Sequence, residues 1–243
     1  MTNLGLLAMT VAVAGALAAL PQEPDSAPHG PQPPVRKLLV LPPEASVTRR
    51  GVKAAVPLME QSRQLETAFQ RVANSLLAAK GCTVLPDLLA SASPGNDSDL
   101  KYAIADLEKS FDQLQAKISK KSKDVPRGRF TLGDEVSKVN PDGSADALLF
   151  IRGQGLLTTG GERTFDIMTG GVVGLLIAED RLSLQAAVVD ARTGTVIGYG
   201  KHGSTGNFLK SDGPAEKSMR EALSHFFCAH PDESPAPSET PKP

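Results

Sequence analysis

Tryptophan is absent from this chain of 243 residues, and aromatic side chains make up only 4% of it. So low a content disfavours a stacking platform for bases or sugars. The chain also lacks an excess of charge of either sign, because it has 26 basic and 27 acidic side chains and a formal net charge of -1. Such a chain has no excess field to attract nucleic acid through counterion release. The composition therefore excludes nucleic acid from the expected partners.

The usual groups of catalysis are scarce as well. The chain has four histidines, of which His29 and His230 lie in its Pro-rich ends and only His202 and His225 remain for imidazole chemistry. Neither cysteine has a second Cys or His at metal-ligand spacing. The segment Gly200-Lys201-His202 departs from a phosphate loop, because His202 stands where Ser or Thr would hold magnesium. We expect no catalytic, cofactor-binding or metal-binding residues.

An uncharged apolar run from Leu4 to Leu20 is the most informative feature that is present. Small residues at Ala16 and Ala18 offer a cleavage pattern, and a polar segment follows, as in secretory signal peptides. The run would cover roughly 25 Å as a helix, less than the ~30 Å hydrocarbon core. We expect residues 1–20 to be a signal peptide. A retained anchor and a buried cytosolic helix are the alternatives, and the absence of Lys or Arg before the run is its one departure from the pattern.

Export would determine the compartment of the protein, and Pro-rich segments mark the expected ends of its folded domain. No Cys follows the apolar run, so we expect an extracytoplasmic, periplasmic protein that is not anchored as a lipoprotein through a Cys. Residues 21–35 carry six prolines and read as a disordered linker, and residues 229–243 form a similar Pro-rich tail. An oxidising compartment would allow Cys82 and Cys228 to pair. Two separate buried thiols are the alternative.

Hydrophobic periodicity predicts a single α/β domain over residues 36–228 in the order β-α-β-α-β-β-β-α. We expect a mixed sheet of about five strands (37–41, 82–85, 145–157, 182–189 and 195–199) and three main helices (65–79, 98–118 and 214–227), with a short helix within 131–139. A basic loop through Arg49 and Lys53 should follow the first strand. The link Asp190-Ala191-Arg192-Thr193-Gly194 predicts a C-terminal antiparallel hairpin. Gly153 and Gly155 suggest a twisted edge.

The second main helix has a narrow apolar stripe at steps of four and three, from Leu100 to Ile118. Packing against the domain's own sheet explains it best. The alternative is a coiled-coil seam of a secreted adaptor, although fewer than three heptads is short for that.

Residues 165–178, between the third and fourth expected strands, are apolar apart from Asp166. Loops are normally polar, so this segment predicts a contact with a protein partner, a second copy of the chain or a membrane surface. A helix folded against the domain's own sheet is the alternative. The candidate contact residues are Phe165, Ile167, Met168, Val172, Val173, Leu175 and Leu176.

The segments ADALLFIRGQG (145–155) and LSLQAAVVDARTGTVIGYGKHG (182–203), followed by an amphipathic helix, resemble bacterial envelope proteins related to CsgG, LpoB and the N-terminal domain of TolB. In that group an Ala-Asp strand start accompanies an Asp-x-x-Thr-Gly hairpin, here Asp190, Thr193 and Gly194. The resemblance covers residues 36–228. It implies a non-enzymatic module that assembles envelope machinery through protein contacts.

The sequence thus favours a periplasmic interaction or assembly module over an enzyme. A small-molecule-binding or hydrolytic domain that uses His202 is the alternative from another class. It would require His202 to lie in a deep pocket beside a carboxylate and a hydroxyl group.

Overall fold

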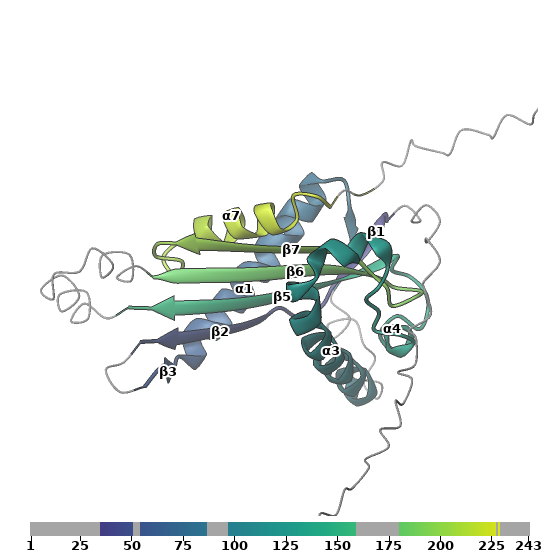
Figure 1. Ribbon diagram of the computed structural model, residues 1–243, viewed down its shortest axis with the longest axis horizontal. Helices are drawn as coiled ribbons and strands as arrows, with labels where there is room; N and C mark the ends of the chain where they lie inside the picture. Colours follow the sequence, from purple (N-terminus) through teal and green to yellow (C-terminus); the bar gives the residue numbers. More distant parts are fainter. Residues whose placement is uncertain (1–34, 51–53, 87–96, 159–179, 227, 229–243) are drawn as a thin grey trace, which may run out of the picture.

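The computed structural model describes residues 35–50, 54–86, 97–158, 180–226 and 228. It is a mixed α/β domain (Figure 1). Its elements, in chain order, are β1 (Lys37–Val40), β2 (Glu44–Arg49), β3 (Val56–Pro57), α1 (Met59–Ala79), β4 (Thr83–Val84), α3 (Asp97–Lys120), the 3-10 helix η1 (Ser122–Arg127), α4 (Glu135–Val139), β5 (Ala147–Leu157), β6 (Arg181–Asp190), β7 (Val196–Thr205) and α7 (Gly213–Ala222). Within these residues, no helix combines the length and apolar character that a membrane span requires.

Strand β5 is the centre of a mixed sheet of seven strands. β6 pairs with it antiparallel along almost its whole length, and β7 continues the sheet beyond β6 as the predicted antiparallel hairpin. On the other side of β5, β1 pairs parallel with its first residues and β2 pairs parallel with its second half. The short strands β4 and β3 complete the sheet beside β1 and β2. The sheet is therefore five strands wide at the two ends, where β4 or β3 is paired, and four strands wide between them.

The predicted basic loop after the first strand is wrong in its first part, because Glu44–Arg49 forms β2. β1 and β2 lie end to end along the same side of β5, with the break at Pro42 and Pro43, which have no N–H to donate. The sequence Glu-Ala-Ser-Val-Thr-Arg lacks the hydrophobic pattern that would predict this strand, because of its six residues only Val47 is buried.

Two apolar layers cover the sheet. On one face, α1 and α7 pack side by side over β2, β6 and β7. Val35, expected in the linker, is also buried in this layer. On the other face, α3, η1 and α4 cover a second cluster that includes Leu148 and Phe150 of β5. In Figure 1, α1 lies behind the sheet and α3 in front of it.

The apolar stripe of α3 is buried in the domain's own core. Leu107, Phe111 and Ile118 are at most 1% exposed. The Phe111 ring stacks on Phe150 of β5, with 4.3 Å between ring centroids. The structure leaves no coiled-coil seam at these positions, so the adaptor interpretation fails.

The predicted twisted edge at Gly153 and Gly155 is also wrong, because both lie inside β5 and pair with strands on either side. Because these glycines have no side chain, aromatic rings can approach the backbone of β5 closely. Phe69 of α1 lies against Gly153, and Phe208 lies against Gly155, in the space that a Cβ would occupy. These glycines let two aromatic rings pack directly on the sheet.

Candidate functional site

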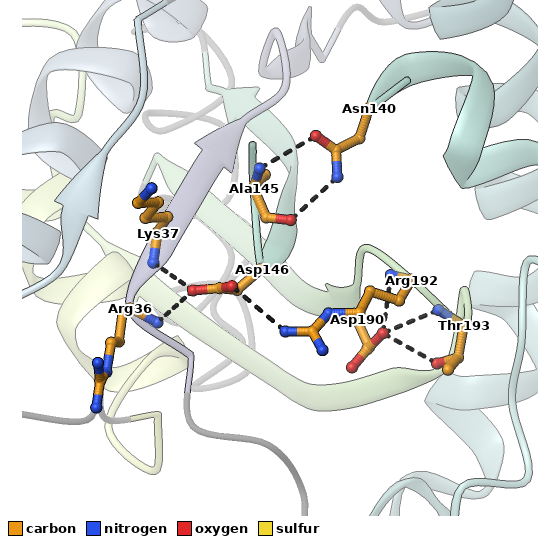
Figure 2. A network of polar contacts seen from close by, with 8 residues as sticks. All are labelled: Arg36, Lys37, Asn140, Ala145, Asp146, Asp190, Arg192 and Thr193. Atoms are coloured by element: carbon orange, nitrogen blue, oxygen red, sulfur yellow. Dashed lines mark hydrogen bonds and ion pairs between the residues drawn. The ribbon is translucent and has the colours of Figure 1, made fainter. Parts of the chain in front are cut away.

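The residues that carry the sequence resemblance form one polar network at the start of β5 (Figure 2). Asp146 Oδ2 accepts hydrogen bonds from the backbone N–H groups of Arg36 and Lys37, each at 2.9 Å. Asp146 Oδ1 lies 3.6 Å from Nη2 of Arg192 in the β6–β7 turn. One carboxylate thus ties the beginning of β1 to the hairpin.

Asp190 holds the hairpin turn itself. Its Oδ1 accepts hydrogen bonds from the N–H groups of Arg192 and Thr193 at 2.9 Å and from the Thr193 hydroxyl at 3.1 Å. Gly194 follows with φ of 69°, a conformation that favours glycine. The Asp-x-x-Thr-Gly motif therefore acts as a turn that caps its own backbone.

Asn140 completes the network from the loop after α4. Its side-chain amide donates to the Ala145 carbonyl at 3.0 Å and accepts from the Ala145 N–H at 3.1 Å. The network's hydrogen bonds are made to backbone groups or within a turn. We assign it to fold stabilisation, and look for function elsewhere.

The opposite end of the sheet has a face that no described helix covers (Figure 1). α3 crosses the inner half of that face, and the outer half carries an open hollow of about 670 Å³. Two rows of residues cross β2, β5, β6 and β7 here: Ser46, Gln154, Ser183 and Gly203 in one row, and Thr48, Leu156, Arg181 and Thr205 in the other. Most of these residues have small or uncharged polar side chains, and most of the exposed area that lines the hollow is nevertheless apolar.

The sequence analysis missed this surface because its residues come from four separate strands. Single strands carry only a weak signal, the alternation of polar with buried residues in β2 and β6. The strand register is needed to assemble the rows.

A polar stripe on α3 borders the hollow at its inner side. Glu108, Asp112, Gln115 and Ser119 recur at spacings of four, three and four, which places them along one side of the helix. They meet the next row of the sheet, which contains Glu44, Arg152, Gln185 and Lys201.

Side-chain hydrogen bonds to Gln185 and Tyr199 fix the C-terminal half of this stripe. Gln115 donates to Gln185 Oε1 at 2.8 Å, and the Tyr199 hydroxyl donates to the same oxygen at 2.6 Å. Ser119 Oγ lies 2.8 Å from the Tyr199 hydroxyl oxygen. Burial raises the pKa of Tyr199, and the Ser119 contact opposes this increase.

The N-terminal half of the stripe is charged. Arg152 is 9% exposed, and its Nε lies 2.9 Å from Asp112 Oδ1 and 3.3 Å from Glu44 Oε2. The guanidinium also lies 5.5 Å from the ring centroid of Phe111. Burial and the neighbouring Glu44 carboxylate raise the pKa of Glu108 to about 8.

A disulfide joins Cys82, just before β4, to Cys228, after α7, with 5.3 Å between the two Cα atoms. Cys82 precedes Thr83, which pairs with Lys37 at the start of β1. The disulfide therefore lies near the end of the sheet that holds the Asp146 network. The hollow lies some ten residues further along β5, or about 30 Å.

His202 does not gain the surroundings that hydrolysis would need. It is half-buried on β7 opposite Leu184, and therefore on the face that α7 covers, away from the hollow. Among the described residues, no hydrogen bond or ion pair reaches its imidazole, and no three His, Cys, Asp or Glu residues form a metal-binding group.

The predicted contact residues Phe165, Ile167, Met168, Val172, Val173, Leu175 and Leu176 lie outside the described residues. The structure does show where their segment starts and returns. Thr158 donates hydrogen bonds to Asp180 Oδ1 from its N–H at 3.0 Å and from its hydroxyl at 3.1 Å. Thr158 follows Leu157 at the end of β5, and Asp180 precedes Arg181 at the start of β6, so both residues lie at strand ends that border the hollow.

Neither the protein-family models nor the curated proteins include a match to this chain. Among solved structures, it is similar to lipoprotein GNA1162 from Neisseria meningitidis, at 14% identity and a TM-score of 0.38, over 78% of this chain and 94% of that one. It is also similar to the LpoB C-terminal domain from Salmonella enterica, at 13% identity and a TM-score of 0.29, over 70% of this chain and 83% of that one.

Proposed function

We propose that this protein is an exported, non-enzymatic interaction module of the bacterial cell envelope. In this proposal the outer end of its sheet contacts a protein partner or a second copy of the chain. The observation that carries the proposal is the place where the 165–178 segment is attached to the sheet. This apolar segment of the sequence joins β5 to β6 at the end of the sheet where one face carries no described helix.

The lining of the hollow suits a reversible contact. Most of its exposed area is apolar, and the hydroxyl and amide groups among it can exchange water for partner hydrogen bonds. The neighbouring apolar segment would add to the hydrophobic centre that most protein interfaces require.

The location within the envelope rests on two features. The uncharged run at residues 4–20 has the pattern of a signal peptide, and a disulfide is expected to persist in an oxidising compartment such as the periplasm. With no Cys after that run, we place the protein in the periplasm without a Cys-linked lipid.

Site-specific photo-crosslinking in cells tests the contact surface. A photoreactive amino acid at Ser183, in the hollow, should give one discrete crosslinked product of defined mass. The matched control is the same amino acid at Tyr102, which is 72% exposed on α3 and outside the hollow. Equal crosslinking at both positions would contradict the proposal.

Substitutions in the apolar segment test its share of the contact. Val173→Asp and Leu176→Asp should each lower the yield of the Ser183 crosslink, whereas Tyr102→Asp should leave it unchanged. Light scattering after size exclusion distinguishes a second copy of the chain from a different protein partner, because a second copy doubles the mass of the purified protein.

Flotation with vesicles instead of a protein crosslink would assign the segment to a membrane surface. Recovery of the leader-bearing chain from the cytosol would overturn the location.

A further inference from the structure

Among the described residues, the inner border of the hollow contains more carboxyl groups than cations. Three carboxyl groups meet there, from Glu108 and Asp112 on α3 and from Glu44 on β2. In the described part of the chain, the cation that they meet is the guanidinium of Arg152 on β5. If all three acids were ionised, the carboxylates would outnumber this cation by two.

The arrangement of this cluster calls for a proton. Glu108 lies one helical turn before Asp112 on α3, and Asp112 and Glu44 lie 2.9 Å and 3.3 Å from Arg152 Nε, which brings the carboxyl groups of Glu108 and Glu44 together beside Arg152. An ionised carboxylate only accepts hydrogen bonds, so a hydrogen bond between these two groups requires that one of them carries a hydrogen to donate. A pair of carboxyl groups that shares one proton is the usual outcome when two such groups are held in contact.

The cluster is incompletely satisfied, which makes its charge state matter. Among the described residues, the buried atoms Glu108 Oε1 and Arg152 Nη2 have no hydrogen-bond partner. The guanidinium is held through Nε, by Asp112 and Glu44, and through Nη1, which lies 3.4 Å from the Ile151 carbonyl oxygen. The attraction of Arg152 for Glu108 is therefore a smaller influence on the Glu108 pKa than burial and the Glu44 carboxylate.

The same cluster joins α3 to the sheet beside the buried apolar stripe of the helix. That stripe includes Phe111, whose ring stacks on Phe150, and the Gln115 and Ser119 contacts follow near the C-terminus of α3. Among the described residues, the charged groups that meet at Glu108 are Asp112 from α3, Glu44 from β2 and Arg152 from β5. A change of charge at this point acts directly on the packing of α3.

We propose that α3 is held on the sheet by a proton-dependent clamp, in which one proton shared by Glu108 and Glu44 completes the carboxyl cluster around Arg152. Loss of that proton places two adjacent carboxylates in a half-buried site. Their repulsion loosens the N-terminal half of α3 from β2 and β5. Because α3 borders the hollow, the inner edge of the hollow then depends on pH.

The sign of the effect follows from the raised pKa of Glu108. The folded protein keeps the proton up to about pH 8, whereas an unfolded chain releases it near pH 4.5. Its stabilising effect is complete below pH 4.5, declines as the pH rises towards 8, and is absent above that. Alkaline conditions therefore loosen the clamp.

Carbon-13 NMR of the side-chain carboxyl groups measures the proton directly in the exported protein. We expect one glutamate, assigned to Glu108 by its loss in Glu108→Gln, to show a pKa at least two pH units above the ordinary glutamate value of 4.5. A pKa of Glu108 near 4.5 would overturn the proposal.

Thermal unfolding of matched variants measures the clamp. Glu108→Gln can donate to Glu44 at every pH, so its Tm relative to the wild type should rise by roughly 2–4 °C between pH 6 and pH 9. Glu60→Gln should show no such change. Hydrogen exchange compared at equal pH should show faster exchange of α3 in the wild type than in Glu108→Gln at pH 9, and equal exchange at pH 6. A pH-independent difference between these proteins contradicts the clamp.

Discussion

Gly200 of β7 lies directly against the backbone of Ala222 in α7, in the space where any other residue would place its Cβ. This contact sets how closely α7 approaches the edge strand of the sheet. Because the obstructing atoms belong to the backbone, rotation of a side chain cannot relieve an overlap. We therefore expect Gly200→Ala to force α7 away from β7.

The change should lower the free energy of unfolding by about 1–3 kcal/mol, as overpacking does elsewhere. Denaturant unfolding of the purified protein measures it. Gly203→Ala is the matched control on the same strand, because the nearest atom to its Cβ would be the Leu182 carbonyl oxygen at an ordinary 3.7 Å. An equal loss in both variants would show that strand propensity, and not the helix contact, decides the result.

Asp146 should contribute to stability through its two backbone partners and little through its ion pair. Asp146→Ala leaves the N–H groups of Arg36 and Lys37 without their acceptor and should cost about 1.5–3 kcal/mol, the range for hydrogen bonds to charged groups. Arg192→Met should cost about 0–1 kcal/mol, because the Arg192 side chain is mostly exposed. Urea unfolding of the two variants checks the order.

Asp134→Ala is the control for the loss of a carboxylate. Asp134 precedes α4 and its side chain makes no capping hydrogen bond. Its replacement should stay within about 0.5 kcal/mol of the wild type. If Arg192→Met were as harmful as Asp146→Ala, the ion pair would be the stronger link.

The buried strands could be read from the sequence because helices cover both of their faces. The run of apolar residues from Ala147 to Ile151 in β5 is continuous for this reason, and so is Leu38 to Leu41 around β1. The Asp190 turn was equally predictable, since its hydrogen bonds are local. These elements give the α/β order and the final hairpin.

The candidate surface could not be predicted in the same way. One face of β2 is covered by no described helix, so its Ser46 and Thr48 resemble loop residues until their pairing with β5 is known. Arg152 and Asp112 are 40 residues apart in sequence, and only the fold brings them together. Features made by strand register and helix placement leave little trace in a single sequence.

Phe111 should be the residue through which α3 contributes most to the core. Phe111→Ala removes a ring that is 1% exposed and stacked on Phe150, and should cost about 3–5 kcal/mol. Tyr102→Ala, on the same helix but 72% exposed, should change stability by less than about 0.5 kcal/mol. Thermal or denaturant unfolding compares the two. A change of oligomeric state without loss of stability in Phe111→Ala would instead revive the coiled-coil interpretation.

The Cys82–Cys228 disulfide closes a long loop, because 146 residues separate its two cysteines. A cross-link of this span restricts the unfolded chain strongly, and its loss typically costs about 2–5 kcal/mol. We expect Cys82→Ser, Cys228→Ser and the double variant to be destabilised equally, since each removes the same bond. Denaturant unfolding with and without a reductant measures the effect, and reductant should alter only the wild type. Single variants that are much less stable than the double variant would show that the packing of the remaining thiol, and not the cross-link, dominates.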